Sequence, residues 1–174
     1  KVEDTIFTVV DVETTGLNPS YNNIIEIALV KVLNNEIIDV YSTLVNPARD
    51  IPYFITQFTG ISNDDVYNAP FFEDIVDEIT SFVEGTVFTA HNLSFDLSFV
   101  RKEFRLCGID NFKPYQLCTL KMARRLYPEL KSKALGKVAN HLRIINPEAH
   151  RAESDAKVTA RILIRMINEL KSNN

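Results

Sequence analysis

The spacing of apolar residues divides the chain into expected strands and helices. Five short segments are rich in β-branched and aromatic residues, as β-strands are: Thr5–Val10, Ile24–Leu33, Glu36–Val45, Thr86–Ala90 and Tyr115–Thr119. Six segments carry apolar residues at helical spacing or begin with a helix-start signal: Pro52–Phe58, Pro70–Val83, Ser94–Leu106, Leu120–Tyr127, Lys133–Leu142 and Glu153–Lys171. Asn34-Asn35, between the second and third strands, predicts a tight hairpin turn.

The order of these elements indicates the α/β fold class. Three strands come first, and helices and strands alternate after them. We therefore expect an antiparallel meander followed by parallel strands that helices connect, in one mixed five-stranded sheet flanked by helices. A length of 174 residues suits a single domain over residues 1–174, with a core from about residue 5 to residue 170.

The first strand ends in two acids. Both alternating sets of its residues are apolar, which is typical of a strand covered on both faces. Asp11 and Glu13 are two residues apart, so both side chains project from one face at the strand's C-terminal end. Paired carboxylates near a core resist ionisation unless a cation lies between them. A single acid in this place is more often a turn or cap residue, so the pair is the informative feature.

Two further acids fall on the apolar faces of expected helices. Asp96 shares its face with Phe99 and Val100, at positions i+3 and i+4. Asp155 shares its face with Thr159 in the last helix. An acid that faces the core must be paired, capped or bound to a metal ion. For Asp96, the alternative is a helix-start residue favoured by the positive end of the helix dipole.

Together, Asp11, Glu13, Asp96 and Asp155 predict one site. Four uncompensated buried carboxylates would be strongly destabilising, whereas two divalent cations, Mg²⁺ or Mn²⁺, would compensate them. Two such ions about 3.5–4 Å apart stabilise both the attacking and the leaving oxygen of phosphodiester cleavage. His150, just before the last helix, is a candidate base for the attacking water, although a lone loop histidine is usually an ordinary surface residue.

These motifs resemble those of the DEDDh 3′–5′ exonucleases, the superfamily of proofreading subunits and domains of bacterial replicative DNA polymerases. Three motifs carry the resemblance, and two shorter segments add to it: Asp11–Gly16, His91–Asp96 and His150–Asp155, then Ile24–Ile27 and Thr59–Ile61. The resemblance implies a ribonuclease H-like three-layer fold. It also implies that the four acids bind the metal ions and that His150 is the general base.

The resemblance further implies a pocket for the 3′-terminal nucleotide. Backbone amides of the turn after Glu13 would meet its phosphate, and other side chains would bind its sugar and base. The implied pocket residues are Thr14, Thr15, Gly16, Leu17, His91, Asn92 and Phe95. Such contacts suit sequence-independent binding of a single strand. For Phe95, plain core packing is the alternative.

Composition limits the classes of partner and of compartment. The net charge is −4, so any binding of nucleic acid must come from a local site. The basic run from Lys121 to Lys137 is either a track for an incoming strand or an ordinary solvated surface. Cys107 and Cys118 form no CxxC motif and predict free thiols in a reducing cytoplasm. No apolar segment approaches membrane-spanning length.

The expected function is therefore a Mg²⁺- or Mn²⁺-dependent 3′–5′ exonuclease. It would release nucleoside 5′-monophosphates from single-stranded or frayed DNA, in proofreading or repair. Two alternatives stay open: the same chemistry on RNA or short oligonucleotides, and a docking module with little turnover of its own. The expected protein partner is a DNA polymerase or helicase, as a separate subunit or a covalently linked domain.

Overall fold

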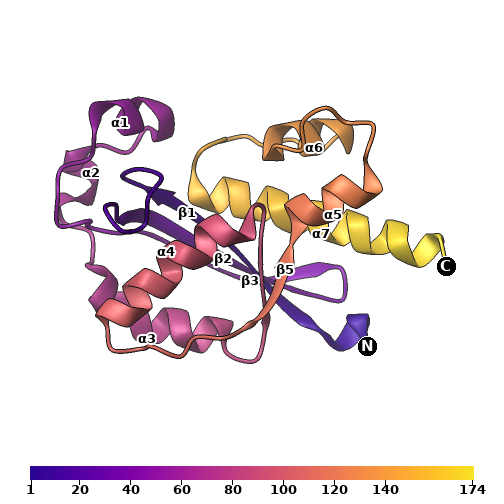
Figure 1. Cartoon of the computed structure of the whole chain (residues 1–174), viewed down its shortest axis with the longest axis horizontal. Helices are drawn as coiled ribbons and strands as arrows, with labels where there is room; N and C mark the ends of the chain where they lie inside the picture. Colours follow the sequence, from indigo (N-terminus) through magenta and orange to yellow (C-terminus); the bar gives the residue numbers. More distant parts are fainter.

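A five-stranded mixed sheet forms the centre of the molecule (Figure 1). The computed structural model describes residues 1–174, and its strands lie in the order β3-β2-β1-β4-β5. Their bounds are β1 (Ile6–Thr14), β2 (Ile24–Leu33), β3 (Glu36–Leu44), β4 (Val87–Ala90) and β5 (Tyr115–Cys118). β1, β2 and β3 pair antiparallel, whereas β4 pairs parallel with both β1 and β5. The predicted meander followed by parallel strands is confirmed.

Seven α-helices accompany the sheet, after a short 3₁₀ turn at Val2–Asp4. They are α1 (Tyr53–Thr59), α2 (Asn63–Tyr67), α3 (Phe72–Val83), α4 (Leu93–Leu106), α5 (Thr119–Leu126), α6 (Leu135–His141) and α7 (Ala152–Ser172). The six predicted helices are present, with ends within two residues of those expected. α2 is additional, and a capping box starts it: the Asp65 N–H donates to the Ser62 hydroxyl, and the Ser62 N–H donates to the Asp65 carboxylate.

The helices cover both faces of the sheet, in three layers (Figure 1). On one face, Phe7 and Val9 of β1 pack against α7, which presents a row of buried alanines, Ala152, Ala156 and Ala160. On the other face, apolar residues of β1 and β2 pack against α3 and α4. Because alanine is small, α7 can lie close to β1 and β2, and this brings its first turn near Asp11 and Glu13.

β1 contains the two acids as expected. The sequence predicts an apolar segment over Thr5–Val10 with Asp11 and Glu13 at the C-terminal end of the strand, and β1 continues to Thr14. The extension arises because β1 pairs with β2 through Glu13 and Glu26, with an irregularity in register between Glu13 and Thr14. Asp11 and Glu13 are therefore both held in the paired part of the strand.

Two smaller expectations are also confirmed. The hairpin between β2 and β3 turns at Asn34 and Asn35, which both have positive φ, 47° and 68°. Cys107 and Cys118 are unpaired thiols. None of the helices combines the length and the hydrophobicity that crossing a bilayer requires.

Candidate active site

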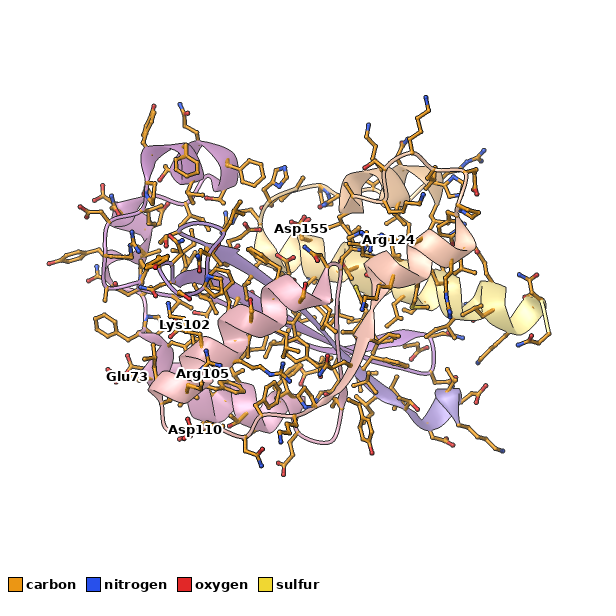
Figure 2. The ribbon with its side chains drawn as sticks, viewed as in Figure 1. Glu73, Lys102, Arg105, Asp110, Arg124 and Asp155 are labelled. Carbon is orange, nitrogen blue, oxygen red and sulfur yellow. The ribbon has the colours of Figure 1, made fainter.

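Asp11, Glu13 and Asp155 form the centre of the site. β1 places Asp11 and Glu13 on the sheet face that α7 covers, and the first turn of α7 places Asp155 beside them. One carboxylate oxygen from each residue lies within 4.8 Å of the other two. Asp155, labelled in Figure 2, is 7% exposed, and the other two acids are half-buried. All the ligand atoms are carboxylate oxygens, which is the set that Mg²⁺ and Mn²⁺ prefer.

Asp96 reaches the same site from α4 by replacing a missing strand contact. β4 pairs with β1 only from Phe7 to Val9, so the N–H of Val12 has no strand partner on that side. Asp96, only 4% exposed, accepts this N–H at 3.1 Å through Oδ1. Its charge also raises the pKa of Asp11. The four predicted acids are thus brought together by β1, α4 and α7.

The electrostatics of the four acids call for positive charge. Burial, and then repulsion from Asp96 and Glu13, raises the pKa of Asp11 well above its usual value. Burial and the charge of Asp155 raise the pKa of Glu13 to about 9, and burial raises the pKa of Asp96 to about 8. Burial also raises the pKa of Asp155, against hydrogen bonds that lower it.

One buried atom fits a cation directly. Oδ2 of Asp11 is buried and has no hydrogen-bond partner. A buried polar atom without a partner is costly, and a divalent cation is the partner that would also offset the repulsion among the carboxylates. The residues present therefore fit a divalent metal centre.

His150 lies at the rim of this centre. Its N–H donates to the Asp155 carboxylate, at 3.3 Å to Oδ1 and 3.2 Å to Oδ2. Its exposed ring stacks on Phe58 of α1, with ring centroids 3.9 Å apart. Asn146 donates to Asp155 as well, at 2.8 Å. The loop before α7 is thus tied to the same carboxylate that faces Asp11 and Glu13.

The end of β1 and the turn after it hold the predicted pocket residues Thr14 to Leu17. Thr14 donates to the Gly16 carbonyl, and Thr15 donates to Oδ1 of Asn22. A Cβ on Gly16 would lie 2.6 Å from that same oxygen, so only glycine fits there without moving Asn22. Leu17 is 83% exposed, as a side chain that presses on a bound base must be before binding.

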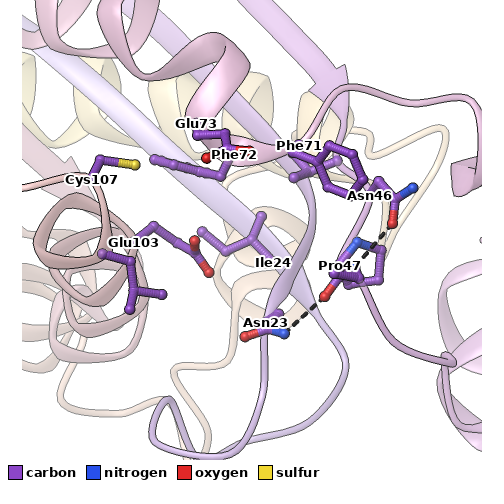
Figure 3. Close-up of a pocket in the computed structure, with 12 residues that line it drawn as sticks. Asn23, Ile24, Asn46, Pro47, Phe71, Phe72, Glu73, Glu103 and Cys107 are labelled. Carbon is purple, nitrogen blue, oxygen red and sulfur yellow. Dashed lines mark hydrogen bonds between the residues drawn. The ribbon is translucent and has the colours of Figure 1, made fainter.

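Asn23 fixes the other end of this turn. Its N–H donates to the Thr15 hydroxyl, and its carbonyl accepts the Thr15 N–H at 2.9 Å. Its side chain donates to the Pro47 carbonyl, at the edge of a cavity of about 230 Å³ (Figure 3). Lys102 of α4 donates to Asn23 Oδ1 at 2.6 Å. The turn is therefore held by the segment that follows β3 and by α4.

In the second predicted motif, His91 makes hydrogen bonds within the chain, whereas Asn92 is exposed. Nε2 of His91 donates to the Lys133 carbonyl at 2.7 Å, and Nδ1 therefore accepts the Thr119 hydroxyl at 2.8 Å. Asn92 is exposed at the start of α4, with φ of 75°. Phe95 is half-buried against Phe99, with ring centroids 5.0 Å apart. The His91 ring joins the end of β4 to the loop before α6.

Glu26 and Arg151 are the residues that sequence reasoning left without a role. Glu26 is buried in β2, and its carboxylate pairs with the Arg151 guanidinium at 2.8 Å. The available signal is a single acid in a strand whose other residues, apart from Lys31, are all apolar. Its partner is 125 residues away in sequence, so the pattern around Glu26 does not reveal what it binds.

The model of the RNase T exonuclease family matches residues 8–163 of the chain. The chain belongs to this exonuclease family. The resemblance to the DEDDh 3′–5′ exonucleases is thereby confirmed. Among relatives, this exonuclease chain is 39% identical over 165 residues to "DNA polymerase III PolC-type" of Caldanaerobacter subterraneus subsp. tengcongensis, covering 95% of the chain and 12% of the relative. It is 37% identical over 166 residues to "3′-5′ exonuclease DinG" of Bacillus subtilis, covering 95% of the chain and 18% of the relative.

Two solved structures have the same fold. "Exonuclease X in complex with 5′ overhanging duplex DNA" aligns with a TM-score of 0.76 and 29% identity, covering 94% of this chain and 92% of that one. The nuclease domain of 3′hExo, described as a DEDDh family member bound to rAMP, aligns with a TM-score of 0.81 and 23% identity, covering 95% and 93%. The exonuclease chain spans less than a fifth of the PolC-type and DinG relatives named above.

Proposed function

We propose that this exonuclease removes nucleoside 5′-monophosphates from the 3′ end of single-stranded or frayed DNA. The observation that carries the proposal is the cluster of the Asp11, Glu13 and Asp155 carboxylates, with the charge of Asp96 acting on Asp11 and a buried oxygen of Asp11 that has no hydrogen-bond partner. The names of the PolC-type, DinG and Exonuclease X relatives support DNA as the substrate and the 3′ end as the point of attack.

In this proposal, Asp11, Glu13, Asp96 and Asp155 hold two divalent cations, Mg²⁺ or Mn²⁺. When bound, two such ions acidify a water molecule and stabilise the charge that develops on the scissile phosphate. His150 accepts the proton of the attacking water, since a histidine imidazole can act as a general base at neutral pH. The hydrogen bond from the His150 N–H to Asp155 keeps the base next to the metal ligands.

The other pocket residues orient the end of the strand. The turn from Thr14 to Leu17 offers backbone amides to the terminal phosphate and the exposed Leu17 side chain to the base. His91, Asn92 and Phe95 lie near the start of α4 and contact the sugar and base. These contacts distinguish no base, so little sequence preference is expected.

The basic run supplies a path for the rest of the strand. Burial is the main cause that lowers the pKa of His91, and the charge of Arg124 lowers it further. Arg124 lies in α5 and is exposed. Arg124 of the run thus lies close enough to His91 of the predicted pocket to affect its charge. Phosphates on this surface would make binding weaker as salt increases.

The partner in this proposal is a DNA polymerase or a larger DinG-type protein. The chain matches the PolC-type polymerase and DinG over only a small part of their length. We propose that the exonuclease works either as a domain of such a polypeptide or in contact with one.

The test is the digestion of 5′-labelled single-stranded DNA with Mg²⁺ or Mn²⁺, beside the Asp155→Ala variant and an EDTA control. A ladder that shortens from the 3′ end, and that is lost in the variant and in EDTA, is the expected result. The same assay on an RNA strand measures the preference for sugar. Folded protein that cleaves neither strand with either metal would contradict autonomous catalysis and favour the docking module.

A further inference from the structure

Glu26 lies next to the proposed metal-binding acids, but its carboxylate contacts groups of the chain itself. It is the direct cross-strand partner of Glu13, so both side chains lie on the face of the sheet that α7 covers. Glu26 is 6% exposed. Its carboxylate accepts the Arg151 Nη2–H at 2.8 Å, the Arg151 Nε–H at 3.2 Å and the Ala152 N–H at 2.6 Å. The charge of Glu26 is therefore matched inside the chain, unlike that of Glu13.

These contacts fix the start of α7. Arg151 is the N-cap residue and makes no side-chain cap of its own, and Ala152 is the first helical residue. A carboxylate from β2 thus accepts a free N–H of the first helical turn, as a capping serine or aspartate usually does. Its negative charge also interacts favourably with the positive end of the helix dipole. The Asp155 N–H donates to the Arg151 carbonyl at 3.0 Å, so the place of Arg151 sets the place of Asp155.

His150 is one residue before this anchor. It has φ of 67°, a conformation that a residue with a Cβ adopts reluctantly. Its ring makes no hydrogen bond within the chain and touches Phe58 alone among the aromatic rings. The position of the base therefore depends on its backbone, which Asp155 holds on one side and the Glu26–Arg151 pair on the other.

We propose that Glu26 is a positioning residue of the exonuclease site. By anchoring Arg151 and Ala152 to β2, it holds His150 and Asp155 in place over Asp11 and Glu13. This inference rests on the proposed function. α7 also packs its alanine row on the sheet, and Glu153 accepts the Ser42 hydroxyl of β3. Loss of the Glu26 contacts therefore loosens the first turn of α7 without unfolding the helix.

The test compares Glu26→Gln with Glu153→Gln. Glutamine keeps the volume of Glu26 but turns an amide donor toward the guanidinium. Glu153 is the matched control, because it is an exposed acid in the same helical turn that also ties α7 to the sheet. In steady-state digestion of labelled single-stranded DNA, we expect Glu26→Gln to lower kcat by about 10- to 100-fold, with KM changed by about twofold or less. We expect Glu153→Gln to leave both constants near those of the parent protein.

Hydrogen exchange of the metal-free protein gives a second measurement that needs no activity. In Glu26→Gln, the amides of Ala152 and Asp155 should exchange at least about tenfold faster, whereas those of Leu163 and Met166 should not change. An active parent whose Glu26→Gln variant keeps its kcat would overturn this inference alone. Faster exchange along the whole of α7 would also overturn it, by showing a general structural role. A parent protein that cleaves nothing would overturn the proposed function, and the exchange comparison would still test the anchoring.

Discussion

Asp11 is the acid of the site that most needs a positively charged partner. It sits in a paired strand, has a buried oxygen without a partner, and feels repulsion from the other three acids. Burial and this repulsion raise its pKa well above the usual value, so they favour the protonated form of this carboxyl in the metal-free protein. A cation would replace that proton. In the proposed mechanism, Asp11 thus links the stability of the fold to the binding of metal.

This view predicts an unusual result for Asp11→Asn. Asparagine has nearly the shape of the protonated acid, so the variant should unfold in EDTA at about the same temperature as the parent protein, within ~2 °C. Addition of Mg²⁺ or Mn²⁺ should raise the unfolding temperature of the parent only. Calorimetry with and without metal measures both. A variant that metal stabilises as much as the parent would exclude Asp11 as a ligand.

His150 offers a second prediction at this scale. Replacing it with alanine or glycine should lower kcat by about 10²- to 10⁴-fold, because both remove the base. The two variants should differ in stability: at φ of 67°, glycine escapes the Cβ strain, so His150→Gly should unfold with a free energy up to about 1 kcal/mol higher than His150→Ala. Denaturant unfolding and single-strand digestion check the two effects. Equal kcat for a variant and the parent would contradict the base role.

At the scale of elements, apolar spacing was sufficient for most of the fold. The predicted helices and strands end within about two residues of their observed ends. For β1, the apolar pattern alone stops at Val10, and the strand continues through Asp11 and Glu13 because Glu13 pairs with Glu26, which is a tertiary contact. The three motifs likewise revealed the four acids, whose convergence follows from β1, α4 and α7. The link from Glu26 to Arg151 was not predictable, because it depends on where α7 docks.

The alanine row of α7 leads to a prediction about the whole helix. Ala156 is fully buried against the sheet and follows Asp155 directly. Ala156→Leu should cost about 1–3 kcal/mol through overpacking, and it should also lower activity because the helix and Asp155 move away from β1. Arg161→Leu, on the exposed side of α7, is the control and should change neither. Thermal unfolding and kinetics separate the two effects. Full activity in a destabilised Ala156→Leu variant would show that Asp155 does not move with the helix.

At the scale of the molecule, the acidic site makes stability depend on pH. In the metal-free protein, the pKa values of Glu13 and Asp96, about 9 and about 8, lie above those of an unfolded chain. The folded state therefore binds more protons, and the free energy of unfolding falls as pH rises from the unfolded pKa values to the folded ones. The penalty is absent at about pH 4 and complete above about pH 9.

The measurement is a series of thermal unfolding curves from pH 6 to pH 9. In EDTA, the unfolding temperature should fall as pH rises. At a metal concentration about 100 times the dissociation constant, binding contributes about 2.7 kcal/mol, which is roughly 5–10 °C for a chain of this size. The gain should be larger at pH 8 than at pH 6, because protons compete with the cation. An unfolding temperature that rises with pH in EDTA would contradict the raised pKa values.

The distance along the chain between Asp11 and Asp155 has a consequence for the order of events during folding. β1 is the first strand and α7 is the last helix, so their contact closes most of the chain into one loop. Contacts of such long sequence separation form late, since the entropy of loop closure is paid before they stabilise anything. A partly folded chain thus carries two of the acids on its sheet but lacks the third member of the cluster. The molecule becomes able to cut a nucleic acid only when its fold is complete.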